Sequence, residues 1–251
     1  MSTEFTFQGD LPDLLRHRWR PQKTVIFPIT RRASVKDVIE SFGIPHTEVG
    51  HIECNGQQVD FSFLVEDNQL FEVYGIEKPW DVTTTTFLRP VPLQDIAFVV
   101  DVNVGRLAKY LRMAGFDTLY NYRWDDKKIV DVLEHANRIV LSRDLGLLKR
   151  KQVEFGRYVR TDKPVEQLEE IVALFGLTQG IRPFTRCLDC NLLLEPVDKN
   201  EILSRLEPLT VKYYTTFSIC RACNKIYWPG SHRDRMEKLL LTMERAEQKF
   251  G

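Results

Sequence analysis

Residues 96–113 read IAFVVDVNVGRLAKYLRM, and this stretch decides the fold of the central part of the chain. Its first five residues are continuously apolar, which is typical of a strand buried on both faces of a sheet. Residues 104–113 then repeat apolar side chains at helical spacing and predict an amphipathic helix. The alternation continues, with strands expected at 118–120, 138–142 and 158–160 and helices at 126–136, 145–151 and 164–175. This order of elements predicts a parallel α/β sheet with helices on its faces.

Acidic side chains follow the predicted strands, at the edge where a parallel sheet places its sites. These residues are Asp101, Asp125, Asp126, Asp144 and Asp162. Converging carboxylates repel one another unless a cation joins them, and clusters of oxygen ligands suit Mg²⁺ or Mn²⁺. The pattern therefore predicts a site for phosphodiester hydrolysis, in which a metal ion lowers the pKa of the attacking water.

The same carboxylates also have an ordinary structural interpretation. Asp125, Asp126 and Asp144 precede predicted helices, where they would serve as N-caps or first-turn acids. Asp162 lies in a Thr-Asp-Lys-Pro turn that its side chain would stabilise. Asp101 fits this interpretation least, because it directly follows a strand and caps the next helix only if that helix begins early. The conjunction of several acids at one sheet edge favours the functional interpretation.

Basic side chains crowd the same part of the sequence. Arg143, Lys149 and Arg150 surround Asp144, and Arg106 lies in the first turn of the helix after Asp101. Together they would hold the phosphates of a nucleic acid. The alternative for each of them is an ordinary solvated surface position.

The five cysteines divide into two pairs and a single residue. Cys187 and Cys190 form one Cys-x2-Cys pair, and Cys220 and Cys223 form a second pair about thirty residues later. Four thiolates close a tetrahedral Zn²⁺ shell with no open position, so the spacing predicts a structural zinc site. Redox chemistry at one pair is the alternative, and it gives the second pair no role. Cys54, in a predicted strand, fits a small core residue.

Residues 1–80 carry shorter, mostly β-like patterns with one helix among them. Ser34 precedes an apolar stripe that predicts the helix, and Asn55-Gly56 predicts a hairpin turn. The segment resembles the ubiquitin-like β-grasp fold of the sulfur carriers. Those carriers act through a free C-terminal Gly-Gly, whereas this chain continues into further protein. We therefore interpret residues 1–80 as a binding or docking module and residues 81–94 as a linker.

Several motifs follow one another between residue 95 and about residue 235. They are Asp101, 105–112 (GRLAKYLR), 115–118 (GFDT), Asp125-Asp126, Ser142-Arg143-Asp144, 184–187 (FTRC) and 226–232 (IYWPGSH). Together they resemble the Mut-seven C-terminal RNase family. The resemblance implies a PIN-like RNase domain at 95–180, a zinc ribbon with a C-terminal helix (234–250) at 181–251, and a ubiquitin-like module in front of both.

The resemblance also implies roles for individual residues. The PIN-like acidic set corresponds to Asp101, Asp126 and Asp144, with Asp162 as a fourth member, and Asp101 and Asp144 would bind Mg²⁺ or Mn²⁺. Asn103 matches the Asp-x-Asn start of many PIN nucleases, on the nucleic-acid side of the site. PIN enzymes commonly have Glu where Asp125 or Asp126 stands, so either residue is a candidate for the third acid.

The chain has 251 residues, and its 35 basic side chains balance its 35 acidic ones. The protein therefore has no net charge that would attract it to nucleic acid or to an anionic membrane. Residues 1–90 are nevertheless acidic, with 13 acidic and 9 basic side chains. The first twenty residues lack the apolar run of a signal peptide, and no apolar run approaches the ~18 residues of a membrane helix. We expect a cytoplasmic protein.

Two functions compete for this sequence. The leading hypothesis is a Mg²⁺- or Mn²⁺-dependent ribonuclease that hydrolyses RNA phosphodiester bonds. The alternative is a non-catalytic RNA- or ribosome-binding adaptor that uses the zinc ribbon and the basic surface. A protein partner bound through the ubiquitin-like module is compatible with both.

Overall fold

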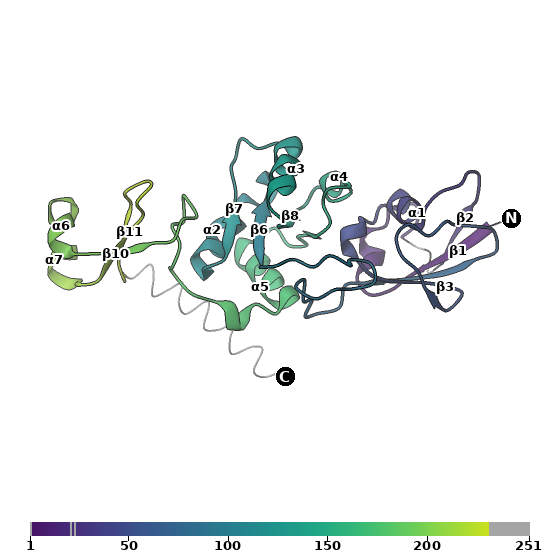
Figure 1. Ribbon diagram of the computed structural model, residues 1–251, viewed down its shortest axis with the longest axis horizontal. Helices are drawn as coiled ribbons and strands as arrows, with labels where there is room; N and C mark the ends of the chain where they lie inside the picture. The colour runs from purple at the N-terminus through teal and green to yellow at the C-terminus, as the bar shows by residue number, and fades with distance from the viewer. Residues whose placement is uncertain (1, 21, 23, 231–251) are drawn as a thin grey trace.

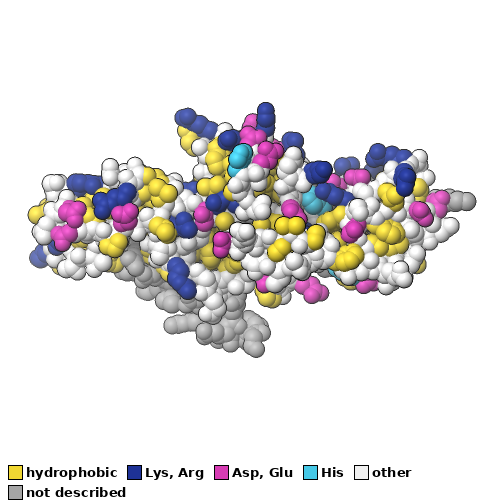
Figure 2. Space-filling view, in the orientation of Figure 1, with side chains coloured by type: hydrophobic (Ala, Val, Ile, Leu, Met, Phe, Trp, Pro, Cys, Tyr) yellow, Lys and Arg dark blue, Asp and Glu magenta, His cyan; other side chains and the backbone are white. Residues whose placement is uncertain are grey.

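The computed structural model describes residues 2–20, 22 and 24–230. It places three parts in chain order along the long axis of the molecule: a β-sheet module, a central α/β domain and a cysteine-bearing module (Figure 1). Acidic and basic side chains are interspersed along the face shown in Figure 2, in keeping with the balanced charge of the chain. In the described part of the chain, no helix combines the length and apolarity needed to cross a membrane. The helix predicted at 234–250 lies outside the described residues.

The N-terminal module is a five-stranded sheet with one helix, as the ubiquitin-like prediction requires. Its elements are β1 (Ser2–Phe7), β2 (Thr24–Pro28), α1 (Val35–Phe42), β3 (Val49–Cys54), β4 (Gln57–Gln58) and β5 (Leu70–Gly75). The strands pair in the order β2-β1-β5-β3-β4, with β1 and β5 parallel at the centre. The hydroxyl of Ser34 caps α1 by accepting a hydrogen bond from the amide of Asp37 at 3.2 Å. Asn55 and Gly56 have positive φ angles, as the short hairpin turn between β3 and β4 requires.

The central domain is a parallel sheet with the strand order β7-β6-β8-β9. Its elements are β6 (Ala97–Val100), α2 (Gly105–Ala114), β7 (Asp117–Leu119), α3 (Asp126–His135), β8 (Ile139–Ser142), α4 (Leu145–Leu148), β9 (Gly156–Tyr158) and α5 (Pro164–Phe175). From β6 the chain adds β7 on one side and then returns to add β8 on the other. This reversal creates a switch point at the carboxyl ends of β6 and β8, where sheets of this kind place their sites.

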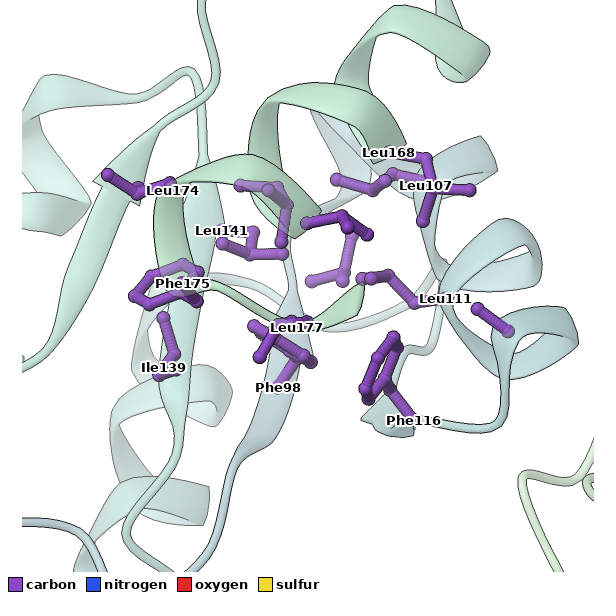
Figure 3. Close-up of a cluster of buried hydrophobic side chains, with 14 of the residues drawn as sticks. Phe98, Leu107, Leu111, Phe116, Ile139, Leu141, Leu168, Leu174, Phe175 and Leu177 are labelled. Atoms are coloured by element: carbon purple, nitrogen blue, oxygen red, sulfur yellow. The ribbon is translucent and has the colours of Figure 1, made fainter. Parts of the chain in front are cut away.

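Side chains of the central strands alternate between two buried faces. Phe98 and Val100 of β6 pack in the cluster formed with α2 and α5, whereas Val99 packs with α3 on the opposite face. Figure 3 shows the first cluster, whose labelled members are Phe98, Leu107, Leu111, Phe116, Ile139, Leu141, Leu168, Leu174, Phe175 and Leu177. Burial on both faces explains why residues 96–100 are apolar without interruption.

Two predicted elements of the central domain differ from the structure by more than one residue at an end. The helix expected at 145–151 is the single turn α4, and the strand expected at 158–160 is β9, which begins and ends two residues earlier. The central residue of β9 is Arg157, which is charged yet only 2% exposed. A buried arginine removes the apolar signal by which a strand is recognised in a sequence.

Residues 81–94 join the N-terminal module to the central domain, and several of their side chains are buried. Val82 and Leu93 belong to the core of the central domain, and Leu88 belongs to the core of the N-terminal module. Arg89 is 2% exposed, and its guanidinium donates to three carbonyls of the N-terminal module at 2.9, 3.1 and 3.3 Å. It also donates to one carbonyl of the central domain at 3.2 Å. The segment therefore packs against both parts.

The C-terminal module is an antiparallel sheet with short helices beside it. Its elements are β10 (Glu195–Val197), α6 (Lys199–Ile202), α7 (Pro208–Tyr213), β11 (Phe217–Ile219) and β12 (Ile226–Tyr227). Arg112 of α2 joins this module to the central domain, because its guanidinium donates to the carbonyls of Leu188 at 3.0 Å and Asp189 at 2.9 Å. The three-part fold expected from the sequence is thereby confirmed.

Candidate active site and zinc site

Asp101 lies at the switch point of the central sheet, directly after β6. Its side chain is held by three hydrogen bonds and the residue is only 5% exposed. Oδ1 accepts from the amide of Val102 at 2.6 Å, and Oδ2 accepts from Ser142 Oγ at 2.7 Å and from Asn103 Nδ2 at 2.6 Å. The Asp101 amide also donates to the carbonyl of Leu141 at 3.0 Å. These contacts fix the carboxylate between the ends of β6 and β8.

Ser142 and Asn103 connect the two strand ends. The Ser142 hydroxyl, which is fully buried, donates to Asp101 and accepts from the amide of Asp144 at 2.8 Å. The Asn103 side chain donates to Asp101 and accepts from the amide of Arg143 at 3.0 Å. Asn103, proposed from the sequence to face nucleic acid, thus uses its amide within the site to hold other residues.

Asp144 is exposed and caps α4. Its Oδ1 accepts from the amides of Gly146 at 2.6 Å and Leu147 at 3.4 Å. Asp144 therefore caps a helix, as its structural interpretation predicts, and it also lies at the sheet edge. Because both capping bonds go to Oδ1, a ligand at this edge would be met by the second carboxylate oxygen.

The adjacent acids Asp125 and Asp126 have different surroundings. Asp125 is exposed and caps α3, accepting from the amide of Lys128 at 2.8 Å. Burial raises the pKa of Asp126, and the negative charges of Asp144 and Asp101 raise it further. Arg150 opposes this shift from 3.8 Å away. Asp126 is thus electrostatically coupled to the carboxylates at the switch point.

The remaining residues proposed from the sequence do not all face this cluster. Asp162 is exposed in the turn between β9 and α5, and Arg106 is exposed in the first turn of α2. Arg143 donates through its guanidinium to the carbonyl of Arg160 at 3.2 Å. Lys149 donates at 2.8 Å to the carbonyl of Glu40, which belongs to the N-terminal module. Arg150 alone among these basic residues forms an ion pair with an acid of the cluster.

Sequence reasoning assigned no role to Ser142, although it lies in the motif Ser142-Arg143-Asp144. The available signal was a hydroxyl residue at the end of a buried strand, two positions before an acid. Sequence reasoning also missed that Arg157 and Arg160 bind carboxylates, because their partners Asp10 and Glu48 lie more than a hundred residues away in the chain.

The four cysteines have the geometry of one metal site. Their sulfur atoms all lie within 4.8 Å of one another, and the Cys187 and Cys223 sulfurs are 3.7 Å apart. A tetrahedral zinc shell with Zn–S bonds of ~2.3 Å separates sulfurs by about 3.8 Å. Burial raises the pKa of Cys187, but hydrogen bonds from Tyr227 and from backbone amides outweigh it and lower the pKa to about 7. The donor set, charge and spacing all fit Zn²⁺.

The carboxylates at the switch point are less tightly gathered. Among the residues that the structure describes, the cysteines are the one group of three or more His, Cys, Asp or Glu side chains spaced to hold a single ion. The hydrogen bonds of Asp101 and the capping bonds of Asp144 hold these carboxylates in their present positions. Burial is the main cause of the raised pKa of Asp126, and the negative charges of Asp144 and Asp101 add to it.

Comparison with known proteins gives two matches, in the order expected. The family model of the Mut7-C RNAse domain matches residues 96–240, and that of the Mut7-C ubiquitin domain matches residues 1–81. No curated protein and no solved structure matches the chain. The first match contains the switch-point acids and the four cysteines and spans more than half of the chain, so this protein belongs to the Mut7-C RNAse domain family.

Proposed function

We propose that this chain is a Mg²⁺- or Mn²⁺-dependent ribonuclease that hydrolyses RNA phosphodiester bonds at Asp101, Asp126 and Asp144. The family match supports a ribonuclease-type activity. The observation that carries the proposal is the placement of Asp101 and Asp144 just after β6 and β8, the two strands that flank the switch point, where their charges add to the rise that burial causes in the pKa of Asp126. Carboxylates with perturbed pKa values cluster at functional sites.

Each acid would contribute differently to the site. Asp101 is immobilised by Ser142 and Asn103, so it offers a carboxylate of fixed position. Asp144 and Asp126 are more open and would complete the oxygen ligands of a cation. When bound, a Mg²⁺ or Mn²⁺ ion would activate water and offset the negative charge that develops on the phosphate.

Basic residues around the acids would hold the RNA. Arg150 is 3.8 Å from Asp126, where a phosphate would meet the arginine and the cation together. Arg106 is exposed on α2, the helix that follows Asp101. These side chains position the backbone of the substrate and read no sequence.

The adaptor hypothesis has two observations in its favour. Asp144 caps α4 and Asp125 caps α3, so two of the acids already have structural roles. On the zinc module, Tyr213 is 66% and Trp228 38% exposed, and Arg221 is also exposed. Exposed aromatic rings beside basic side chains bind single-stranded RNA by stacking and charge.

A cleavage assay with Asp144→Asn separates the two functions. Asparagine caps helices as well as aspartate does, so α4 should persist while the charge is lost. We expect single-stranded or hairpin RNA to be cleaved only when Mg²⁺ or Mn²⁺ is added, and the variant to lose about 100-fold or more in rate. Asp125→Asn, which also keeps a cap, is the matched control and should retain activity.

The zinc content of each sample is measured in parallel, so that loss of zinc is not mistaken for loss of the catalytic cation. Cleavage that persists in Asp144→Asn would reject the acidic site. A folded, zinc-loaded wild type that binds RNA without cleaving it would favour the adaptor.

A further inference from the structure

Glu48 belongs to the N-terminal module, yet among the described residues its side chain bonds only to the central domain. It lies in the short 3-10 helix His46–Glu48 before β3 and is fully buried. Oε2 accepts from Arg157 at 2.7 Å and from Arg160 at 3.0 Å, and Oε1 accepts from the amide of Tyr158 at 2.6 Å. A carboxylate that is buried in this way is part of one folded unit and not of a loose docking contact.

Further charges complete this network. Asp10, also from the N-terminal module, accepts from Arg157 and Arg160 at 2.9 Å each. Glu170 of α5 accepts from the amide of Arg160 at 2.9 Å and lies 3.4 Å from Arg157. Complete burial raises the pKa of Glu48, and the two guanidinium groups oppose that rise. The arginines are thus enclosed by carboxylates from both parts of the molecule.

The network reaches the candidate active site through Arg160. The carbonyl of Arg160 accepts a hydrogen bond from the guanidinium of Arg143 at 3.2 Å. Arg143 stands between Ser142 and Asp144, and its amide is bonded to Asn103. A continuous series of hydrogen bonds therefore runs from Glu48 through Arg160 and Arg143 to the residues that hold Asp101.

The segment after Asp144 is also held by the N-terminal module. Leu145 packs against the hydrophobic core of that module. Lys149 donates to the carbonyl of Glu40, and the imidazole of His46 bonds to the carbonyl of Val153 at 2.9 Å. Leu145, Lys149 and Val153 thus tie this segment to the ubiquitin-like module.

We propose that Glu48 is a positioning residue of the nuclease, which fixes Arg160 so that its carbonyl holds the side chain of Arg143, the residue whose amide is bonded to Asn103 between Ser142 and Asp144. The ubiquitin-like module is then a fixed part of the catalytic unit, whatever partner its outer surface binds. This inference rests on the proposed function, because it assigns the module to the same site.

Glu48→Gln in the full chain tests the proposal, since glutamine keeps the size of the side chain and removes its charge. We expect the turnover of metal-dependent RNA cleavage to fall about 10-fold or more in this variant. The exposed Glu169→Gln is the matched control and should leave turnover unchanged. In an Arg143→Ala background, Glu48→Gln should have no further effect, because the two residues act in series. Additive losses in the double variant would overturn the proposal.

Amide hydrogen exchange gives a second readout that does not depend on activity. We expect Glu48→Gln to speed exchange about 10-fold at Arg143, Gly146 and Leu147, whose amides are bonded within the site, and to leave the β6 amides unchanged. Unchanged exchange at these three residues, or equally faster exchange throughout the sheet, would overturn the proposal. If the wild type cleaves no RNA, the proposed ribonuclease function is rejected. Hydrogen exchange would still show whether Glu48 holds Arg143, Gly146 and Leu147 in place.

If Glu48→Gln does not fold, Arg160→Met provides the same exchange test. It removes the guanidinium that links Glu48 to the segment that contains Arg143 and leaves Arg157 paired with the buried carboxylate.

Discussion

Two clusters of charged residues lie in the central domain, and they are built in opposite ways. At the interface with the N-terminal module, Glu48, Asp10 and Glu170 enclose Arg157 and Arg160, so each charge has an opposite partner. At the switch point, the negative charges of Asp144 and Asp101 add to the effect of burial in raising the pKa of Asp126, and the exposed Arg150 is the basic side chain paired with these acids among the described residues. Removing one partner from the buried network leaves a charge uncompensated, whereas the acids at the sheet edge are the group that our proposed function assigns to a cation.

The largest effect should come from removing an arginine at the interface. Arg157→Met leaves Glu48 buried with one guanidinium fewer, and we expect a loss of about 3–5 kcal/mol in the free energy of unfolding. Arg150→Met makes the same change beside the acidic cluster, where the pair is 55% and 36% exposed and should contribute about 1 kcal/mol or less. Urea unfolding of both variants measures the contrast. Equal losses in the free energy of unfolding would show that the two clusters contribute to stability in the same way.

A smaller effect is expected for Asp10→Asn. Burial raises the pKa of Asp10, but Arg157 and Arg160 outweigh burial and hold the pKa below its usual value. An acid with a lowered pKa stabilises the fold above its unfolded pKa, and this stabilisation disappears as the pH falls through the folded pKa. We expect the variant to lose about 1 kcal/mol at pH ~7 and almost nothing near pH ~2. A loss that does not depend on pH would contradict the ionic role of Asp10.

The smallest effect should have the opposite sign. The pKa of Asp126 is raised, so its ionised form costs stability once the pH exceeds the folded pKa, and this cost is absent at low pH. Asp126→Asn should therefore stabilise the fold by about 0.3 kcal/mol at pH ~7 and by nothing near pH ~3, in buffer without added Mg²⁺ or Mn²⁺. Urea unfolding at the two pH values tests this. A variant less stable than the wild type at neutral pH would mean that Asp126 has a structural role.

The sequence predicted the parts of this molecule that depend on local patterns. The alternation of apolar strands and amphipathic helices predicted the parallel sheet, and the spacing of Cys187, Cys190, Cys220 and Cys223 predicted a site whose sulfurs the structure gathers. Asp101 and Asp144 were found because each follows a strand, and parallel strands bring such residues to one edge.

The remainder depends on contacts between distant residues. Nothing near Glu48 in the chain indicates that it meets Arg157, which is 109 residues away. Arg157 and Arg160 look like solvated basic residues in a sequence, and only the docking of the two modules encloses them. The roles of Ser142 and Asn103 likewise become visible only when β6 and β8 lie side by side.

Trp80 has a consequence for any attempt to isolate the central domain. It lies within the stretch matched by the ubiquitin-like family model, yet its ring stacks on Phe155 and Phe175 of the central domain. Its amide donates to the carbonyl of Leu174. A cut at the boundary between the two family matches would therefore remove Trp80 from the central domain. The Trp80 ring would then be left without its partners Phe155 and Phe175 on the N-terminal fragment. A fragment meant to contain the central domain should therefore include Trp80.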